Sequence, residues 1–330
     1  MLKREVTLGI DIGGTNTVFG FVDREGNLIS ESSISTNQHQ GAQDLVLRLS
    51  LEINNLLEKI SKDYILRGIG IGAPNGNYYK GTVENPPNLK WGIINLIEIF
   101  HQYFDLPVAV TNDANASALG EMLFGAAKGM KNFIVITLGT GLGSGIVVDG
   151  KLVYGSDGFA GEIGHTIYDP EGRLCGCGRR GCLETYASAT GIKRTVMELF
   201  GNSNEDSVLR NISFNDLDSK MIYSAAMSGD NLALQAFEYT GKVLGIKLAD
   251  AVAHTSPEAI ILFGGLALAG DLIISPTKKY MEDNLFHVFK NKVKIIPSGL
   301  TKGNSAVLGA GALIWNEISD HQELKISSDL

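Results

Sequence analysis

A glycine-rich strand, turn and strand unit occurs twice in this chain of 330 residues. The first copy occupies residues 6–29 and the second begins at Phe133. In both copies Gly and Asp interrupt an apolar alternation typical of strands. A hairpin signal follows each time, at Asp23–Gly26 in the first copy and at Asp149-Gly150 in the second. Each copy therefore predicts a short antiparallel meander.

The two copies align without a gap. The alignment pairs Asp11 with Thr137, Gly13 with Gly139, Gly14 with Thr140 and Asp23 with Asp149. A repeated unit at the head of each half predicts a duplicated domain with a cleft between the copies. Two unrelated glycine-rich hairpins remain the alternative.

Helical and strand-like segments alternate after each meander. Residues 44–60 have apolar side chains at helical spacing, whereas Leu66–Ile71 and Val108–Thr111 are short apolar strands. This alternation is typical of an α/β fold. Because the chain is longer than one core usually supports, we expect two domains.

Charge and hydropathy exclude several classes of partner. The net charge of -8 is accompanied by no evident basic stripe, so binding to nucleic acid or to anionic lipid is disfavoured. The start of the chain runs directly into a strand and does not resemble a signal peptide. The longest apolar run, Ala259–Ala269, has about half the length that a membrane span needs. We therefore expect a small-molecule substrate. The three cysteines are too close together and odd in number for a disulfide framework, so we expect a reducing cytoplasm as the setting.

The turn that ends the first strand, Asp11-Ile-Gly-Gly-Thr-Asn16, has the composition of a phosphate-binding turn. Its glycines allow backbone N–H groups to approach phosphate oxygens closely. The second copy supplies a matching turn at its Gly and Thr residues, although a plain tight hairpin is the alternative for each turn. The predicted phosphate-binding residues are Asp11, Gly13, Gly14, Thr15, Asn16, Gly139, Thr140 and Gly141. We expect Asp11 to hold Mg²⁺ through water, because Mg²⁺ keeps several waters and takes few carboxylates.

Two other nucleotide signatures are incomplete. Gly145–Lys151 meets most of the Walker A pattern, but Leu152 follows the lysine and cannot ligate magnesium. The segment also spans a predicted hairpin instead of opening a helix. A strict GxGxxG fingerprint fails at Ser144, so a Rossmann dehydrogenase is disfavoured.

Asp113 lies where an apolar strand meets a helix, in the segment Thr111-Asn-Asp-Ala-Asn-Ala116. Phosphoryl transfer needs a carboxylate of this kind to accept a hydroxyl proton. The alternative is a helix N-cap, a role that Asp and Asn both fill well. Local sequence leaves both roles open.

The most specific signal is a cluster of potential metal ligands. His165 is followed by Cys175, Cys177 and Cys182, which are the only cysteines in the chain. Three thiolates and an imidazole complete a closed structural zinc site, and the intervening glycines permit a tight knuckle. Buried free thiols or a redox pair are the alternatives, but a redox pair leaves His165 and one cysteine unexplained.

Together these motifs, from Asp11 to Gly311, resemble the ROK family of sugar kinases and related repressors, and the zinc segment is the most specific part of the match. The resemblance implies an actin-like, hexokinase-type (ribonuclease H-like) duplicated fold of two α/β domains with the sugar held in a cleft between them. It implies ATP-dependent phosphorylation of a hexose at its 6-hydroxyl, with glucose as the expected substrate in carbohydrate metabolism and glycolysis. The implied cofactors are ATP, Mg²⁺ and a structural Zn²⁺.

The same resemblance assigns roles to individual residues. Asp113 becomes the catalytic base, and Gly264 and Gly265 form an adenosine-binding turn. The implied hexose contacts are Asn88, Asn112, Asp113, Glu162, His165 and Glu184. His165 then serves both the metal and the sugar, which is feasible because a metal leaves the second ring nitrogen free.

Domain organisation and assembly follow from the resemblance as well. We expect a small domain of residues 1–111 with about 312–330, and a large domain of residues 112–311 that carries the zinc segment 165–182. A homodimer or homotetramer is expected. The segment Asn75–Lys80 departs from the Gly-Pro and acidic pattern of many family members, which leaves the small-domain sugar contacts undefined.

Rival functions divide into two classes. Fructokinase, mannokinase and N-acetylhexosamine kinase share the phosphate-binding and base residues, and neither the hexose nor polyphosphate as a donor is decided by one sequence. A sugar-responsive transcriptional repressor carries a helix-turn-helix before the sugar fold. Here Asp11 leaves no room for one, so a repressor is disfavoured.

Overall fold

The computed structural model describes residues 3–37, 39–300 and 303–328. Two compact units make up the chain. The first unit comprises Met1–Gly129, Leu152–Ala160 and Gly299–Leu330, and the second comprises Met130–Lys151 and Gly161–Ser298. Among the described residues, no helix combines the length and the apolar character that a membrane span requires.

The first unit is built on a five-stranded sheet of order β3-β2-β1-β4-β8. β1 pairs antiparallel with β2 and parallel with β4, and β4 pairs parallel with β8. A small three-stranded sheet, β5-β6-β7, lies in the loop region that follows β4. The elements of the first unit are β1 (Arg4–Ile12), β2 (Asn16–Asp23), β3 (Leu28–Ser35), α1 (Gly41–Ile60), β4 (Tyr64–Gly72), β5 (Gly76–Asn77), β6 (Thr82–Glu84), β7 (Ile93–Asn95), α2 (Leu96–Phe100), β8 (Val108–Thr111), α3 (Asp113–Leu123) and α8 (Ser305–Ser328).

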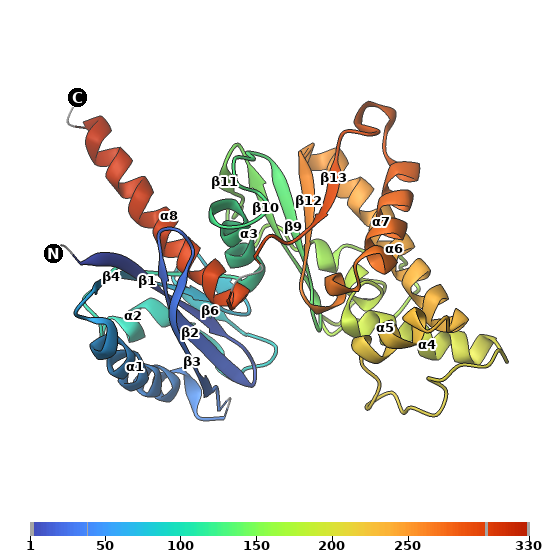
Figure 1. Cartoon of the computed structure of the whole chain (residues 1–330), viewed down its shortest axis with the longest axis horizontal. Coiled ribbons are helices and arrows are strands. Elements are labelled where there is room, and N and C mark those ends of the chain that lie inside the picture. The colour runs from blue at the N-terminus through green and yellow to red at the C-terminus, as the bar shows by residue number, and fades with distance from the viewer. Residues whose placement is uncertain (1–2, 38, 301–302, 329–330) are drawn as a thin grey trace. The chain divides into compact units, whose positions relative to one another are not determined.

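The second unit repeats this topology with the sheet order β11-β10-β9-β12-β13. β9 pairs antiparallel with β10 and parallel with β12, which pairs parallel with β13. The predicted duplication is therefore present in the strand order of both sheets. The elements are β9 (Phe133–Leu138), β10 (Leu142–Val148), β11 (Lys151–Leu152), η1 (Ile163–His165), η2 (Leu183–Thr185), α4 (Ala189–Asn202), α5 (Ser219–Met227), α6 (Asn231–Thr255), β12 (Ala259–Phe263), η3 (Gly265–Ala269), α7 (Asp271–Asn284), η4 (His287–Phe289) and β13 (Lys294–Pro297), and Figure 1 labels the principal ones.

The two meanders differ in one detail of pairing. Ile12 pairs with Thr17 across the first turn, whereas its counterpart Leu138 pairs with Leu142, one residue nearer to the turn. The sequences align without a gap, but the hydrogen-bond register across the second turn is shifted by one residue. The two turns consequently have related sequences and different local geometry.

Helix α8 packs against the first sheet through glycines on both sides of the contact. Gly9 of β1 and Gly70 of β4 are neighbours in the sheet. A Cβ atom at Gly9 would collide with the carbonyl oxygen of Val307, and one at Gly70 with that of Ala310. Only glycine lets the helix backbone approach the strands this closely. The small residues near the end of the sequence therefore form a packing face.

Helix α3 lies against α8 in the same manner. A Cβ atom at Gly309 would lie 2.7 Å from the carbonyl oxygen of Ala116. This contact places both helices in the first unit, whereas the sequence analysis assigned α3 and the start of α8 to the large domain. The boundaries between the compact units therefore do not follow residues 111 and 311. Packing between helices that are distant in the sequence decides which unit contains each helix.

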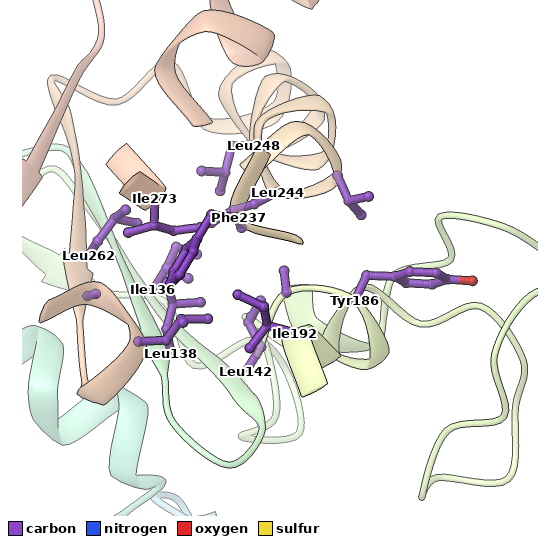
Figure 2. Close-up of a cluster of buried hydrophobic side chains, with 14 of the residues drawn as sticks. Ile136, Leu138, Leu142, Tyr186, Ile192, Phe237, Leu244, Leu248, Leu262 and Ile273 are labelled. Atoms are coloured by element: carbon purple, nitrogen blue, oxygen red, sulfur yellow. The ribbon is translucent and has the colours of Figure 1, made fainter. Parts of the chain in front are cut away.

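The core of the second unit lies where α6 packs with the sheet. Phe237 of α6, Ile136 of β9 and Leu262 of β12 belong to one buried cluster, which Figure 2 shows together with Leu142 and Ile192. A separate core in the first unit contains residues of β1, β4 and α1. Two cores with similar sheets are expected of a duplicated α/β chain.

Candidate active site

The first glycine-rich turn follows directly from β1. Asp11 is the second-last residue of β1, and its side chain is half-buried. The N–H of Gly13 donates to the carbonyl oxygen of Asn16 at 3.0 Å, and the Thr36 hydroxyl donates to the Gly13 carbonyl at 2.7 Å. Thr15 and Asn16 remain exposed. The turn is thus held from behind while its tip is accessible to a ligand.

Asn88 lies against this turn. A Cβ atom at Gly14 would come within 2.9 Å of the Asn88 Cβ, so a side chain at position 14 would displace Asn88. The structure therefore brings the predicted sugar-side Asn88 into contact with the predicted phosphate turn. The sequence contained no signal for this contact, because the two segments are far apart in the chain.

Two carboxyl groups of the first unit have raised pKa values. Burial, and to a smaller extent the nearby Asp113 carboxylate, raises the pKa of Asp11 from 3.8 to about 6. Desolvation also raises the pKa of Asp113, against the lowering effect of the N–H of Ala114. A bound cation beside such a pair would offset the repulsion between them.

Helix α3 begins at Asp113, and Asn112 is its N-cap. The Asn112 Oδ1 accepts the N–H of Ala114 at 2.7 Å, and the Asp113 Oδ1 approaches the same N–H at 2.8 Å. The cap that the sequence left open for Asp113 thus belongs to Asn112. Asn is among the residues preferred at the N-cap, so its place directly before the helical segment could have identified Asn112 as the cap. Asp113 keeps an exposed surface at the start of the helix.

The second turn connects β9 and β10. The N–H of Gly139 donates to the carbonyl oxygen of Gly141 at 3.1 Å, and the N–H of Gly143 donates to the Thr137 hydroxyl at 3.1 Å. Thr140 at the tip is exposed. Thr137 occupies the position that aligns with Asp11, so the second turn lacks the acidic group of the first.

Gly264 packs behind this second turn. It has φ of 96°, a conformation that favours glycine, and a Cβ atom there would lie 2.8 Å from the carbonyl oxygen of Leu138. Gly265 is exposed and has open space around its Cα. The structure therefore places the predicted adenosine turn beside the end of β9, immediately before Gly139.

The segment that resembles Walker A is a hairpin, as predicted. β10 ends at Val148, and Asp149 and Gly150 have φ of 51° and 74°. Positive φ at both central residues is the geometry of a tight hairpin turn. No helix opens at Lys151, which belongs to the short strand β11.

The four predicted metal ligands lie together in the second unit. One donor atom each from His165, Cys175, Cys177 and Cys182 falls within 4.8 Å of all the others. The Cys175 Sγ is 3.8 Å from the His165 Nδ1, and the sulfurs of Cys177 and Cys182 are 3.6 Å apart. Tetrahedral zinc places such ligand atoms about 3.5–3.8 Å from one another. The donor set and its spacing therefore fit Zn²⁺, with the His165 Nε2 left for another partner.

A tight knuckle holds these thiols. The N–H of Gly178 donates to the Cys175 carbonyl at 3.0 Å, and the N–H of Cys175 donates to the Arg179 carbonyl at 2.9 Å. Gly178 and Gly181 have φ of 87° and 72°. The glycines thus permit the backbone to reverse direction within the ligand segment.

The other predicted sugar contacts of the second unit surround this cluster. Glu162 is exposed and precedes η1, which ends at His165. Glu184 lies in η2, two residues after Cys182, and its Oε1 is 3.6 Å from the Cys175 Sγ. The structure brings Glu184 next to the predicted metal ligand Cys175 and places Glu162 on the turn that carries the His165 imidazole.

A second bond of Glu184 escaped the sequence analysis. Its Oε2 accepts the N–H of Leu142, the residue after the second glycine-rich turn, at 3.0 Å. Glu121 of α3 was also overlooked. It is fully buried, and its Oε2 accepts the N–H groups of Ala126 at 2.7 Å and Gly299 at 3.1 Å. The bonds from Glu184 to Leu142 and from Glu121 to Gly299 have no local sequence signal, because each joins segments that are distant in the chain.

Comparison with known proteins identifies the family of this chain. A family model described as the ROK family matches residues 7–317, and the chain belongs to this family. A glucokinase of Halalkalibacterium halodurans is 37% identical over 281 residues, covering 83% of this chain and 84% of the relative. A ROK family glucokinase from Streptomyces griseus, solved with glucose and AMPPNP, has a TM-score of 0.78 at 34% identity and covers 93% of this chain and 98% of its own. The sequence-based family and fold are therefore confirmed.

Repressors also resemble this chain. A xylose repressor of Caldicellulosiruptor bescii is 34% identical over 258 residues, which cover 78% of this chain and 64% of the repressor. Family membership alone therefore includes both enzymes and regulators, and the site residues must distinguish them.

Proposed function

We propose that this ROK family chain is an ATP-dependent sugar kinase that phosphorylates glucose at its 6-hydroxyl. The observation that carries the proposal is the placement of Asp113 at the start of α3, where Asn112 is the N-cap, near the Asp11 carboxyl of the first glycine-rich turn. The glucokinase relatives support glucose as the substrate.

In the proposed reaction the 6-hydroxyl oxygen of the hexose attacks the γ-phosphorus of ATP. A new P–O bond forms, the bond to the β-phosphate oxygen breaks, and ADP leaves. Asp113 accepts the hydroxyl proton. Because desolvation raises its pKa, Asp113 is a stronger base than an ordinary carboxylate.

The two turns would bind the phosphates. Backbone N–H groups of Gly13, Gly14, Gly139 and Gly141 and the side chains of Thr15, Asn16 and Thr140 would hold the phosphate oxygens, with Gly264 and Gly265 against the adenosine. Asp11 would hold Mg²⁺ through water, and a cation there would offset the effect of burial on the Asp11 carboxylate. When bound, Mg²⁺ neutralises charge on the transferred phosphoryl group.

The proposed hexose contacts are those that the family resemblance implies. Asn88, Asn112 and Asp113 lie in the first unit, and Glu162, His165 and Glu184 in the second. The Asn112 Oδ1 is engaged by the helix cap, so its amide NH₂ is the group that would meet a hydroxyl. A structural Zn²⁺ on His165 and the three cysteines would hold the imidazole in place.

The remaining parts of the proposal concern setting and assembly. The cysteines are free thiols, and a thiolate metal site persists in a reducing compartment, which favours the cytoplasm. The proposed partners are ATP and hexose, in a homodimer or homotetramer that light scattering would test. Nucleic acid is not a proposed partner.

A coupled ADP-release assay would test the activity. The panel should contain glucose, fructose, mannose and N-acetylhexosamines, with ATP and polyphosphate as alternative donors. We expect the highest kcat/KM with glucose and ATP. Preference for another hexose would replace glucose in the proposal, and absence of ADP release with every sugar would refute kinase activity.

A repressor is the second candidate, because the xylose repressor relative covers much of the chain. Gel shifts with genomic fragments, with and without hexose, would test it. We expect no retarded band. A specific band released by a sugar would favour the regulatory function.

A further inference from the structure

Both ends of the second glycine-rich turn are attached to the segment that follows the last metal ligand. At one end, the N–H of Ala189 donates to the Gly139 carbonyl at 2.9 Å. At the other end, the N–H of Leu142 donates to the Glu184 Oε2 at 3.0 Å. The turn Gly139–Gly141 is therefore held on either side by a stretch of six residues, 184–189.

This stretch is itself rigidly built. The Ser188 hydroxyl donates to the Glu184 carbonyl at 2.8 Å and accepts the N–H of Gly191 at 2.9 Å. Leu183 and Ser188 are fully buried. The Thr185 hydroxyl donates to the Cys182 carbonyl at 2.8 Å. Segment 184–189 is thus anchored to the metal-binding knuckle at its start and to helix α4 at its end.

The Glu184 carboxylate fills the space beside the turn. A Cβ atom at Gly141 would collide with the Glu184 Oε2, so this carboxylate and a side chain at position 141 exclude each other. The backbone N–H of Leu142 is buried with its residue, and Glu184 supplies its acceptor. Removal of that acceptor would leave a buried donor unsatisfied, which is costly.

The other oxygen of the same carboxylate faces the metal cluster. The Glu184 Oε1 is 3.6 Å from the Cys175 Sγ. One short side chain therefore contacts a metal ligand with one oxygen and the end of the glycine-rich turn with the other.

We propose that Glu184 is a positioning residue for the nucleotide-binding turn Gly139–Gly141, in addition to its proposed contact with the hexose. It fixes the end of the turn through the Leu142 N–H, so the N–H groups that face the phosphates are preorganised before ATP arrives. This inference rests on the proposed function, because it requires that the second turn binds nucleotide. It predicts that loss of a residue assigned to the sugar weakens nucleotide binding even when no sugar is present.

The test measures AMPPNP affinity by calorimetry without any hexose, in wild type and in four variants. Glu184→Ala removes the acceptor, and Glu184→Asp keeps the charge but is one methylene too short to reach the Leu142 N–H. Glu184→Gln keeps an acceptor oxygen and presents an NH₂ group to the Cys175 sulfur. Glu162→Ala is the matched control, since Glu162 is a proposed sugar contact outside segment 184–189.

We expect Glu184→Ala and Glu184→Asp to bind AMPPNP about tenfold more weakly than wild type. Glu184→Gln and Glu162→Ala should bind it within about twofold of wild type, although both weaken glucose binding. Hydrogen exchange at the Leu142 amide should accelerate in the Ala and Asp variants alone. Metal content and Tm, measured on each protein, identify variants that have lost the fold.

Two results would overturn the inference. The first is a folded Glu184→Asp or Glu184→Ala protein that binds AMPPNP as tightly as wild type. The second is a Glu184→Gln protein whose AMPPNP affinity falls as much as that of the Ala and Asp variants. If the wild-type protein itself bound no AMPPNP, the proposed function would fail and this inference with it. If it bound AMPPNP and phosphorylated glucose while the Glu184 variants bound normally, only the positioning role would be rejected.

Discussion

Asn112, and not its neighbour Asp113, is the N-cap of helix α3. The Asn112 side-chain oxygen accepts the Ala114 N–H at 2.7 Å, which satisfies a donor that an N-cap aspartate would otherwise have to satisfy. The structure therefore assigns the N-cap to Asn112, and Asp113 remains the proposed catalytic base.

The first prediction concerns Asp113→Asn. Loss of a general base typically lowers kcat by roughly 10²–10⁴, which corresponds to about 3–5 kcal/mol of barrier. Affinity for glucose should change far less, because the amide keeps the size and much of the hydrogen bonding. Steady-state kinetics and calorimetry would measure the two quantities.

Asn112→Ala is the matched control for the cap. It should lower the free energy of unfolding by about 1 kcal/mol through loss of the N-cap, whereas Asp113→Asn should leave stability nearly unchanged. Near-normal turnover in a folded Asp113→Asn protein would remove Asp113 from the mechanism.

The second prediction concerns the metal. Purified protein should contain about one zinc per chain, and a strong chelator should lower the Tm, since a metal bound only by the folded state stabilises it. Cys177→Ser should lose zinc and bind glucose more weakly, because the His165 imidazole would no longer be held. Elemental analysis, thermal melts and calorimetry would measure these effects.

Adding zinc back to the chelated wild type should restore both the Tm and glucose affinity. A metal-free protein with full activity would contradict the structural role of zinc. Unchanged glucose affinity in Cys177→Ser would contradict the coupling between metal and sugar.

The third prediction concerns the close approach of α8 to the first sheet. Gly70→Ala places a methyl group against the Ala310 carbonyl and should destabilise the protein by about 3 kcal/mol, or prevent folding. Gly201→Ala is the matched control, because Gly201 lies near the end of α4 with open space around it. That change should stabilise by up to about 1 kcal/mol. Chemical denaturation would compare them, and equal stability of the two variants would exclude the tight contact.

The fourth prediction concerns pH. The N–H groups of Asn132 and Lys131 bond the Glu258 carboxylate and hold its pKa below the usual 4.5. A depressed pKa in the folded state stabilises the protein above the unfolded pKa, and this contribution disappears as pH falls through the folded value. Glu258→Gln should therefore lower Tm at pH 7, and the difference from wild type should shrink as the pH falls below about 4.5.

The effect will be modest, because Glu258 is exposed and solvent screens it. Glu58→Gln, on the exposed face of α1, provides a control that should not change Tm at pH 7. If the Tm of Glu258→Gln lay below that of wild type by the same amount from pH 7 to pH 3, the charge of Glu258 would not be the cause of the difference.

Local patterns determined much of this protein from the sequence alone. The strand Val108–Thr111 has the predicted bounds, and the Asp149-Gly150 turn has the predicted geometry, because alternation and turn residues act over a few neighbours. The clustering of His165 with the three cysteines was equally predictable, because the four residues lie within 18 residues of each other and a tight knuckle brings them together.

Tertiary structure decided what depends on contacts between distant residues. Thr7 and Gly311 lie 304 residues apart and share a hydrogen bond, and α8 thereby joins the first unit. Leu142 and Glu184 lie 42 residues apart, and nothing in either local sequence indicates the bond between them. Nearly every residue has a backbone N–H donor, so the sequence shows which groups need a hydrogen-bond acceptor when they are buried. Only the packing of the folded chain determines which distant side chain accepts each of these hydrogen bonds.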